Sequence, residues 1–130
     1  MGQPAAKQGD RVVAVDTHLV VVPGAPAPVP LPHPFAGMLS GGLSADVKIM
    51  GKPAAVAGST ADNTPPHLPA PPGTGFQKPP SNKATVQQGS QTVMINSKPA
   101  VRNGDKAITC NDPSDLPAGT VIAVGTVLIG

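Results

Sequence analysis

The sequence of 130 residues lacks tryptophan and tyrosine, and it has only two phenylalanines. A large aromatic core is therefore excluded, and apolar burial must come from valine, isoleucine, leucine and alanine. Glutamate is also absent, so all seven acidic residues are aspartates. The single cysteine excludes an internal disulfide. A domain with so thin a core often depends on a bound metal or on a partner protein.

The distribution of charge and the short length of the apolar runs exclude further classes of protein. The formal net charge is +2, and lysine and arginine form no cluster. The sequence also offers no platform of aromatic residues on which bases could stack, so we predict no nucleic-acid partner. Apolar runs such as residues 19–22 are far too short to span a bilayer. The N-terminus shows no charged stretch followed by a long apolar one, so we predict synthesis in the cytoplasm without a secretory signal.

Glycine and proline are abundant, at 15 and 18 residues, a share that is typical of low-complexity chains. Here they keep fixed positions in a short phrase that occurs three times. The copies span residues 1–10, 50–59 and 96–105, and their shared prolines are Pro4, Pro53 and Pro99. Such a period indicates one supersecondary unit used three times, each unit unable to bury its apolar face alone.

A short apolar alternation of the form Val-x-Ile precedes the second and third copies, at residues 47–49 and 93–95. This pattern favours a half-buried β-strand. Residues 127–130 repeat the strand, and the phrase that should follow it opens the chain. We therefore predict one mainly β domain over residues 1–130, cone-shaped and pseudo-threefold, with adjacent ends and little helix. Its repeats are expected near residues 1–22, 45–67 and 91–110, with a closing strand within 120–130.

Proline-rich segments join the repeats. Residues 23–34 hold six prolines and predict extended, polyproline-like backbone without a sheet ladder. Residues 35–43 are rich in glycine, leucine and alanine and predict either a packed apolar loop or a short helix. Residues 64–80 predict a second proline-rich loop, with Phe76 as its only aromatic residue. The remaining strands are expected at residues 11–15, 19–22, 84–86, 92–95 and 120–129.

The three histidines and the cysteine form a possible metal site: His18, His33, His67 and Cys110. His18 and His67 each lie nine residues after the glycine of their repeat, and Cys110 follows its glycine by six. Threefold symmetry would bring these three positions near one axis, and the proline-rich loop would bring in His33 as the fourth ligand. Three imidazoles and a thiolate suit tetrahedral zinc, and a closed ligand set predicts a structural role.

Two other interpretations of these residues are open. A single histidine is more often a surface or core residue than a ligand, and a lone cysteine is usually a small buried hydrophobe. Alternatively, water in place of Cys110 would make a zinc hydrolase. That chemistry needs a positioned general base, and the sequence has neither glutamate nor a His-Glu-x-x-His spacing. We predict that the protein is not an enzyme.

The phrases at residues 51–55 and 98–105 resemble those of the PAAR-repeat family, named for a Pro-Ala-Ala-Arg motif. The resemblance covers nearly the whole chain, although only the third copy has the arginine, Arg102. It implies a small β-rich cone whose broad base sits on a trimeric spike protein of the VgrG or phage tail-spike type. It also implies a point that faces the target membrane and holds zinc through His18, His33, His67 and Cys110.

The function implied by the resemblance is that of a structural tip. One chain on the threefold axis would cap the central spike of a contractile injection system and sharpen it for membrane puncture. The expected base or supporting walls are the strands at residues 47–50, 93–96 and 127–129. The protein would be delivered with the particle, outside the cell or into the target cell. The alternative is a zinc-stabilised adaptor that recruits effector or toxin cargo. Type VI secretion, an extracellular particle and a phage all remain possible settings.

Overall fold

A computed structural model describes residues 2–130. This part of the chain contains no helix, and therefore none that is long and apolar enough to cross a membrane. The prediction of a mainly β protein is confirmed. The strands are β1 Gln3–Pro4, β2 Arg11–Val21, β3 Val29–Gly41, β4 Lys48–Ile49, β5 Lys52–Pro53, β6 Thr60–Asn63, β7 Gly75–Phe76, β8 Lys83–Val86, β9 Met94–Ile95, β10 Lys98–Pro99, β11 Lys106–Thr109, β12 Leu116–Ile122 and β13 Leu128–Ile129.

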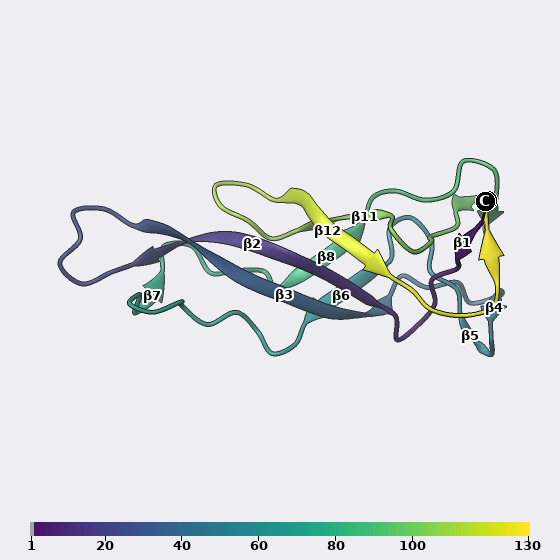
Figure 1. The fold of residues 1–130 in the computed structure, drawn as a ribbon, viewed down its shortest axis with the longest axis horizontal. Helices are drawn as coiled ribbons and strands as arrows, with labels where there is room; N and C mark the ends of the chain where they lie inside the picture. The colour runs from purple at the N-terminus through teal and green to yellow at the C-terminus, as the bar shows by residue number, and fades with distance from the viewer. Residues whose placement is uncertain (1) are drawn as a thin grey trace.

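Six of these strands close into a barrel. They pair antiparallel in the order β2, β3, β6, β8, β11 and β12, and β12 pairs back onto β2 through Thr120 and Val13. The short strand β7 pairs with β2 beyond the barrel. Figure 1 shows the barrel narrowing from the wide end, which carries β1, β4 and β5, toward the β2–β3 hairpin.

The expectation of polyproline-like backbone over residues 23–34 is wrong for its second half. β3 pairs with β2 continuously from Val29 to Met38. Pro30, Pro32 and Pro34 alternate along β3, and all three are exposed. In an antiparallel pair only every second residue directs its N–H at the partner strand. Prolines at a spacing of two therefore all occupy positions where β2 needs no donor.

Both alternatives for residues 35–43 are also wrong, because β3 runs on to Gly41. Phe35, Gly37 and Leu39 are buried and the residues between them are exposed, which is the period of a strand with one face on the core. Glycine occupies position 37 for a steric reason. A Cβ at this position would lie 2.7 Å from the carbonyl oxygen of Asp62, so β6 approaches more closely than a side chain allows.

The three repeated phrases form a closed ring. The N–H of Ala6 donates to the carbonyl of Val101 at 2.9 Å, that of Val101 to Ala55 at 3.1 Å, and that of Ala55 to Ala6 at 3.0 Å. Each of these residues is 0% exposed, so a larger side chain has no room beside this axis. Bridges between neighbouring residues repeat the same cycle: Ala5 with Arg102, Lys7 with Ala54, and Val56 with Ala100. The predicted pseudo-threefold symmetry is thus formed by backbone hydrogen bonds.

Each phrase then turns into the barrel at its glycine. Gly9, Gly58 and Gly104 have φ values of 90°, 97° and 91°, a region that side chains disfavour. A side chain one residue later accepts the backbone N–H at the start of each turn. The three bonds run from Lys7 to Asp10, from Val56 to Ser59 and from Arg102 to Asp105.

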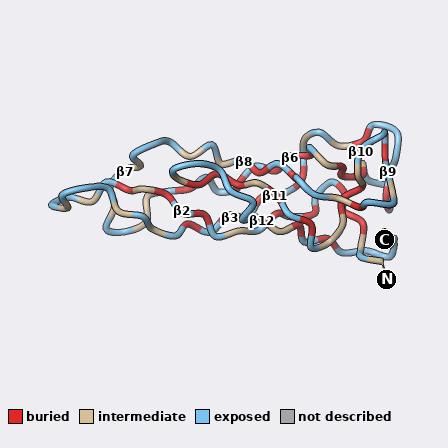
Figure 2. The backbone as a smooth tube through the Cα atoms, turned by 90° about the horizontal axis from the view of Figure 1, so that it is seen from above, coloured by how far each residue is buried: buried red, intermediate tan, exposed pale blue. Residues whose placement is uncertain are grey.

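Three two-stranded pairs make the wide end: the hairpins β4–β5 and β9–β10, and the pair β13–β1. The third joins segments near the two ends of the chain, with Gln3 paired to Ile129, so the predicted closure of the repeat is confirmed. These pairs pack their isoleucines and the first alanines of the phrases into one basal cluster. Figure 2 shows buried segments of backbone at the end that carries β9 and β10. The equivalent members of the basal cluster are Ile49, Ile95 and Ile129 with Ala5, Ala54 and Ala100.

Candidate metal centre

A buried group of four possible metal ligands lies in the narrow half of the barrel: Asp16, His18, His67 and Cys110. One ligand atom from each lies within 4.8 Å of the others. β2 carries Asp16 and His18, the segment after β6 carries His67, and Cys110 directly follows β11. The structure therefore brings together three of the four predicted residues, one from each repeat. Such a group can hold a metal ion.

Asp16 is the member that the sequence analysis missed. Its carboxylate is 0% exposed and accepts bonds on both oxygens. Oδ1 accepts from the Thr109 hydroxyl at 2.6 Å, and Oδ2 accepts from Cys110 Sγ at 3.5 Å and from His67 Nε2 at 2.9 Å. A signal for it existed in the sequence. Residues two apart on a strand face the same side, so Asp16 shares the inward face of His18.

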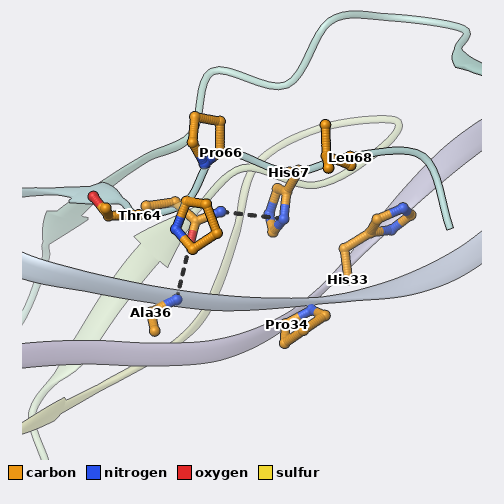
Figure 3. A pocket seen from close by; sticks show the side chains of 9 residues that line it. His33, Pro34, Ala36, Thr64, Pro66, His67 and Leu68 are labelled. Atoms are coloured by element: carbon orange, nitrogen blue, oxygen red, sulfur yellow. Dashed lines mark hydrogen bonds between the residues drawn. The ribbon is translucent and has the colours of Figure 1, made fainter.

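Hydrogen bonds define the tautomer of His67. The Ala36 N–H donates to Asn63 Oδ1 at 2.9 Å, which fixes the Asn63 amide with its Nδ2 toward Nδ1 of His67, at 3.2 Å. Nδ1 is therefore the acceptor nitrogen, and Nε2 carries the proton that it donates to Asp16. Figure 3 shows these bonds as dashed lines linking Ala36 on β3 to His67.

His18 is almost completely buried, at 1% exposure, and neither of its ring nitrogens has a hydrogen-bond partner. Nδ1 lies 3.4 Å from Asp112 Oδ2, within ion-pair range but outside hydrogen-bond geometry. Burial lowers the pKa of His18 below its usual value, and the nearby Asp112 carboxylate opposes that shift. Buried imidazole nitrogens without partners are rare in folded proteins and are suited to a metal ion.

Cys110 is 3% exposed, and burial raises the pKa of its thiol. The Asp16 carboxylate raises this pKa further, while the Asn82 backbone opposes the shift. The thiol donates its proton to Asp16 Oδ2 at 3.5 Å. A metal ion would displace this proton, because a coordinated cysteine binds as the thiolate.

His33 lies beside this group without belonging to it. Its ring centroid is 5.4 Å from that of His18 and 5.6 Å from that of His67, and the His18 and His67 centroids are 5.0 Å apart. Both of its nitrogens are occupied by backbone. Nδ1 bonds the Leu31 carbonyl at 2.9 Å, and Nε2 accepts the Ala70 N–H at 3.1 Å. The role of His33 as the fourth ligand stays a prediction.

A cavity of about 370 Å³ opens beside the metal centre. Its lining residues come from β3 and from the segment after β6: His33, Pro34, Ala36, Asn63, Thr64, Pro65, Pro66, His67 and Leu68. In Figure 3, His33 and His67 rise from these two segments into the same region. Of the four possible ligands, His67 is the one that lines this cavity.

Comparison of the chain with protein-family models and with curated proteins finds no match. The ring of repeats, the wide end and the candidate metal centre are the structural features that bear on its function.

Proposed function

We propose that this protein is a structural tip of the PAAR-repeat type, which caps a trimeric spike and sharpens it for puncture of a target membrane. The observation that carries the proposal is the closed ring of hydrogen bonds among Ala6, Ala55 and Val101. It gives a single chain a threefold axis, and a threefold base on one chain matches a partner made of three identical chains. The repeated phrases that form the ring are the ones that resemble the family.

The three strand pairs of the wide end are the proposed binding surface for the spike. They present equivalent backbone on three sides of the axis, so each could contact one chain of a trimer. These strand pairs carry exposed apolar side chains. Met94 is 57% exposed and Leu128 is 60% exposed, and the two occupy equivalent positions in two of the pairs. Large exposed apolar side chains that cluster at one end are typical of an interaction surface.

Replacing Met94 and Leu128 together by aspartate should abolish co-elution with the trimeric spike protein on size-exclusion chromatography. Two charges would then have to be desolvated at the interface without partners. Because both side chains are exposed, the melting temperature should change little. The matched control is Val15→Asp, a 65% exposed residue on the side of the barrel, which should leave the complex intact. Equal loss of binding in the control would argue against the wide end as the binding surface.

We propose zinc as the metal, held by His18, His33, His67 and Cys110 in a closed site. Imidazoles that bind one tetrahedral zinc at about 2 Å have ring centres about 5 Å apart. The three centroid distances, 5.0, 5.4 and 5.6 Å, support such an arrangement. A sulfur and nitrogens suit zinc better than magnesium or calcium, which prefer oxygen. To bind, His33 would exchange the Ala70 N–H for the metal.

The role of such a centre would be mechanical. His18, His67 and Cys110 come from the three repeats, so a metal ion would cross-link all three in the narrow half of the barrel. The hydrogen-bonded ring already links the three repeats at the wide end. Phe35 is the one aromatic side chain of the barrel core, so metal ligation would supply rigidity that apolar packing does not. Four protein ligands leave no open position for substrate, which supports a structural and not a catalytic centre.

Substitution of His33 by alanine separates the two possible ligand sets. If His33 is the fourth ligand, zinc affinity should fall at least about 10-fold, because even outer-shell changes cost that much. Cobalt-substituted protein should also lose the visible absorption of a tetrahedral site. Leu31→Ala is the control, since it keeps the backbone carbonyl that His33 contacts. Unchanged affinity and spectrum in the His33 variant would assign the fourth position to Asp16 instead.

A further inference from the structure

Three buried side-chain atoms among residues 2–130 lack a hydrogen-bond partner: His18 Nδ1, His18 Nε2 and Asp112 Oδ1. They belong to two side chains that lie against each other, with His18 Nδ1 3.4 Å from Asp112 Oδ2. The side chains are 1% and 3% exposed. Buried polar atoms are satisfied in the great majority of native structures, so a concentration of such atoms at one contact calls for a cause.

Asp112 is fixed to β2 on both sides of His18. Its N–H donates to the Thr17 carbonyl at 2.8 Å, and its Oδ2 accepts the Leu19 N–H at 2.8 Å. The neighbouring Asn111 adds a third bond, because its Oδ1 accepts the Thr17 N–H at 2.7 Å. The segment that follows Cys110 therefore takes the place of a partner strand at Thr17 and Leu19. The carboxylate of Asp112 is held in register with the His18 ring.

Asp112 accepts the Leu19 N–H, but little positive charge lies near its carboxylate. Apart from His18, the cation within ion-pair distance among the described residues is Lys78, with Nζ 3.8 Å from Oδ1. The Lys78 side chain is 60% exposed, so water screens this pair. A buried carboxylate without a strong partner is unfavourable.

A metal ion on His18 would remove this deficit. Metal-bound imidazole becomes a stronger donor at its other nitrogen, and a carboxylate that accepts this proton fixes the ring and its tautomer. We propose that Asp112 is the positioning residue of the metal centre, whose Oδ2 accepts Nδ1–H of His18 so that Nε2 is the nitrogen that binds the metal. This inference rests on the zinc centre proposed above. It assigns a role to a residue that is not itself a ligand.

The test compares Asp112→Asn with wild type, each prepared metal-free and zinc-loaded. Zinc affinity, measured by competition with a chromophoric chelator, should fall about 10- to 100-fold. The melting temperature should fall in the zinc-loaded variant but stay level or rise in the metal-free one, because the substitution removes a poorly compensated charge. The matched control is Asp115→Asn, an exposed aspartate three residues later, which should behave as wild type.

A second variant and a spectroscopic measurement guard against a simple folding defect. Asp112→Ala should lose at least as much zinc affinity as the asparagine variant. In ¹⁵N-edited NMR spectra of zinc-loaded wild type, His18 should be protonated at Nδ1 and metal-bound at Nε2. The reverse assignment would overturn the proposal.

The remaining outcomes separate this inference from the zinc centre. If wild type binds zinc and Asp112→Asn binds it equally well, Asp112 has no positioning role and the zinc centre stands. An equal loss of melting temperature in both forms, with unchanged affinity, would likewise reduce Asp112 to a structural residue. If wild type binds no zinc, the zinc centre and this inference both fail.

Discussion

Cys110→Ser is expected to abolish stable zinc binding and to lower the melting temperature of the zinc-saturated protein by about 10–20 °C. A ligand at 1,000 times its Kd stabilises a fold by about 4 kcal/mol. In a chain of this size, the melting temperature falls by several degrees for each kcal/mol of stability that is lost. Serine keeps the size of the side chain and can still donate to Asp16. The loss should therefore reflect the metal and not the packing. Thermal denaturation with and without zinc measures it.

The chelator provides the control for this substitution. Wild type treated with EDTA should melt close to the Cys110→Ser variant, and the variant should not respond to EDTA at all. A variant that melts as high as zinc-saturated wild type would contradict a stabilising role for the centre. A variant that melts far below EDTA-treated wild type would show that the thiol matters for packing instead.

Phe35→Ala is expected to cost about 3–5 kcal/mol of folding free energy. Phe35 is 2% exposed, the largest fully buried side chain, and its ring centroid lies 6.1 Å from that of His67. The core around it is mostly alanine and valine, which cannot fill the cavity that alanine would leave. Against a typical stability of about 5–15 kcal/mol, the loss is severe. Urea denaturation monitored by circular dichroism measures it.

Zinc should partly rescue this variant, because the metal centre lies directly beside the lost ring. We expect metal-free Phe35→Ala to be largely unfolded near 37 °C and to regain β-structure when zinc is added. The control is Val15→Ala, which removes methyl groups from a 65% exposed side chain and should cost less than about 0.5 kcal/mol. A Phe35→Ala loss as small as that of the control would show that the barrel interior is not the stabilising core.

The ring of repeats could be predicted from sequence because its signal is local. Proline, two small residues and a glycine recur at fixed spacing, and each belongs to the same backbone path. The small residues pack where three chain segments meet at 0% exposure, and the glycines adopt positive φ. Such requirements restrict the residue type at each position, so the fold appears directly in the sequence.

The long hairpin could not be predicted in the same way. Six prolines in residues 23–34 argue against a ladder when they are counted together. Their spacing of two over Pro30, Pro32 and Pro34 was the relevant feature, because it leaves every alternate N–H available to β2. The same period continues through Phe35, Gly37 and Leu39, which composition alone presents as a loop or a helix.

The candidate metal centre was predictable in part. The shared register of His18 and His67 follows from the repeat, and Cys110 joins them as expected. Asp16 and Asp112 were not predicted, because both make their contacts with distant segments. Asp16 accepts from residues 51 and more positions away, and Asp112 reaches the backbone of β2 across 93 positions. The spacing of two between Asp16 and His18 indicates a shared inward face, but no local spacing records the distant partners of either aspartate.

X-ray absorption at the zinc edge, combined with plasma emission analysis of the purified wild-type protein, tests whether zinc holds the three repeats together. We expect about one zinc per chain, bound by one sulfur and by imidazole nitrogens whose ring scattering fits three histidines. Cys110→Ser, prepared in parallel, should lose the sulfur shell together with the metal. Well-folded wild type without zinc, or with zinc in a shell that contains no sulfur, would rule out the proposed zinc centre.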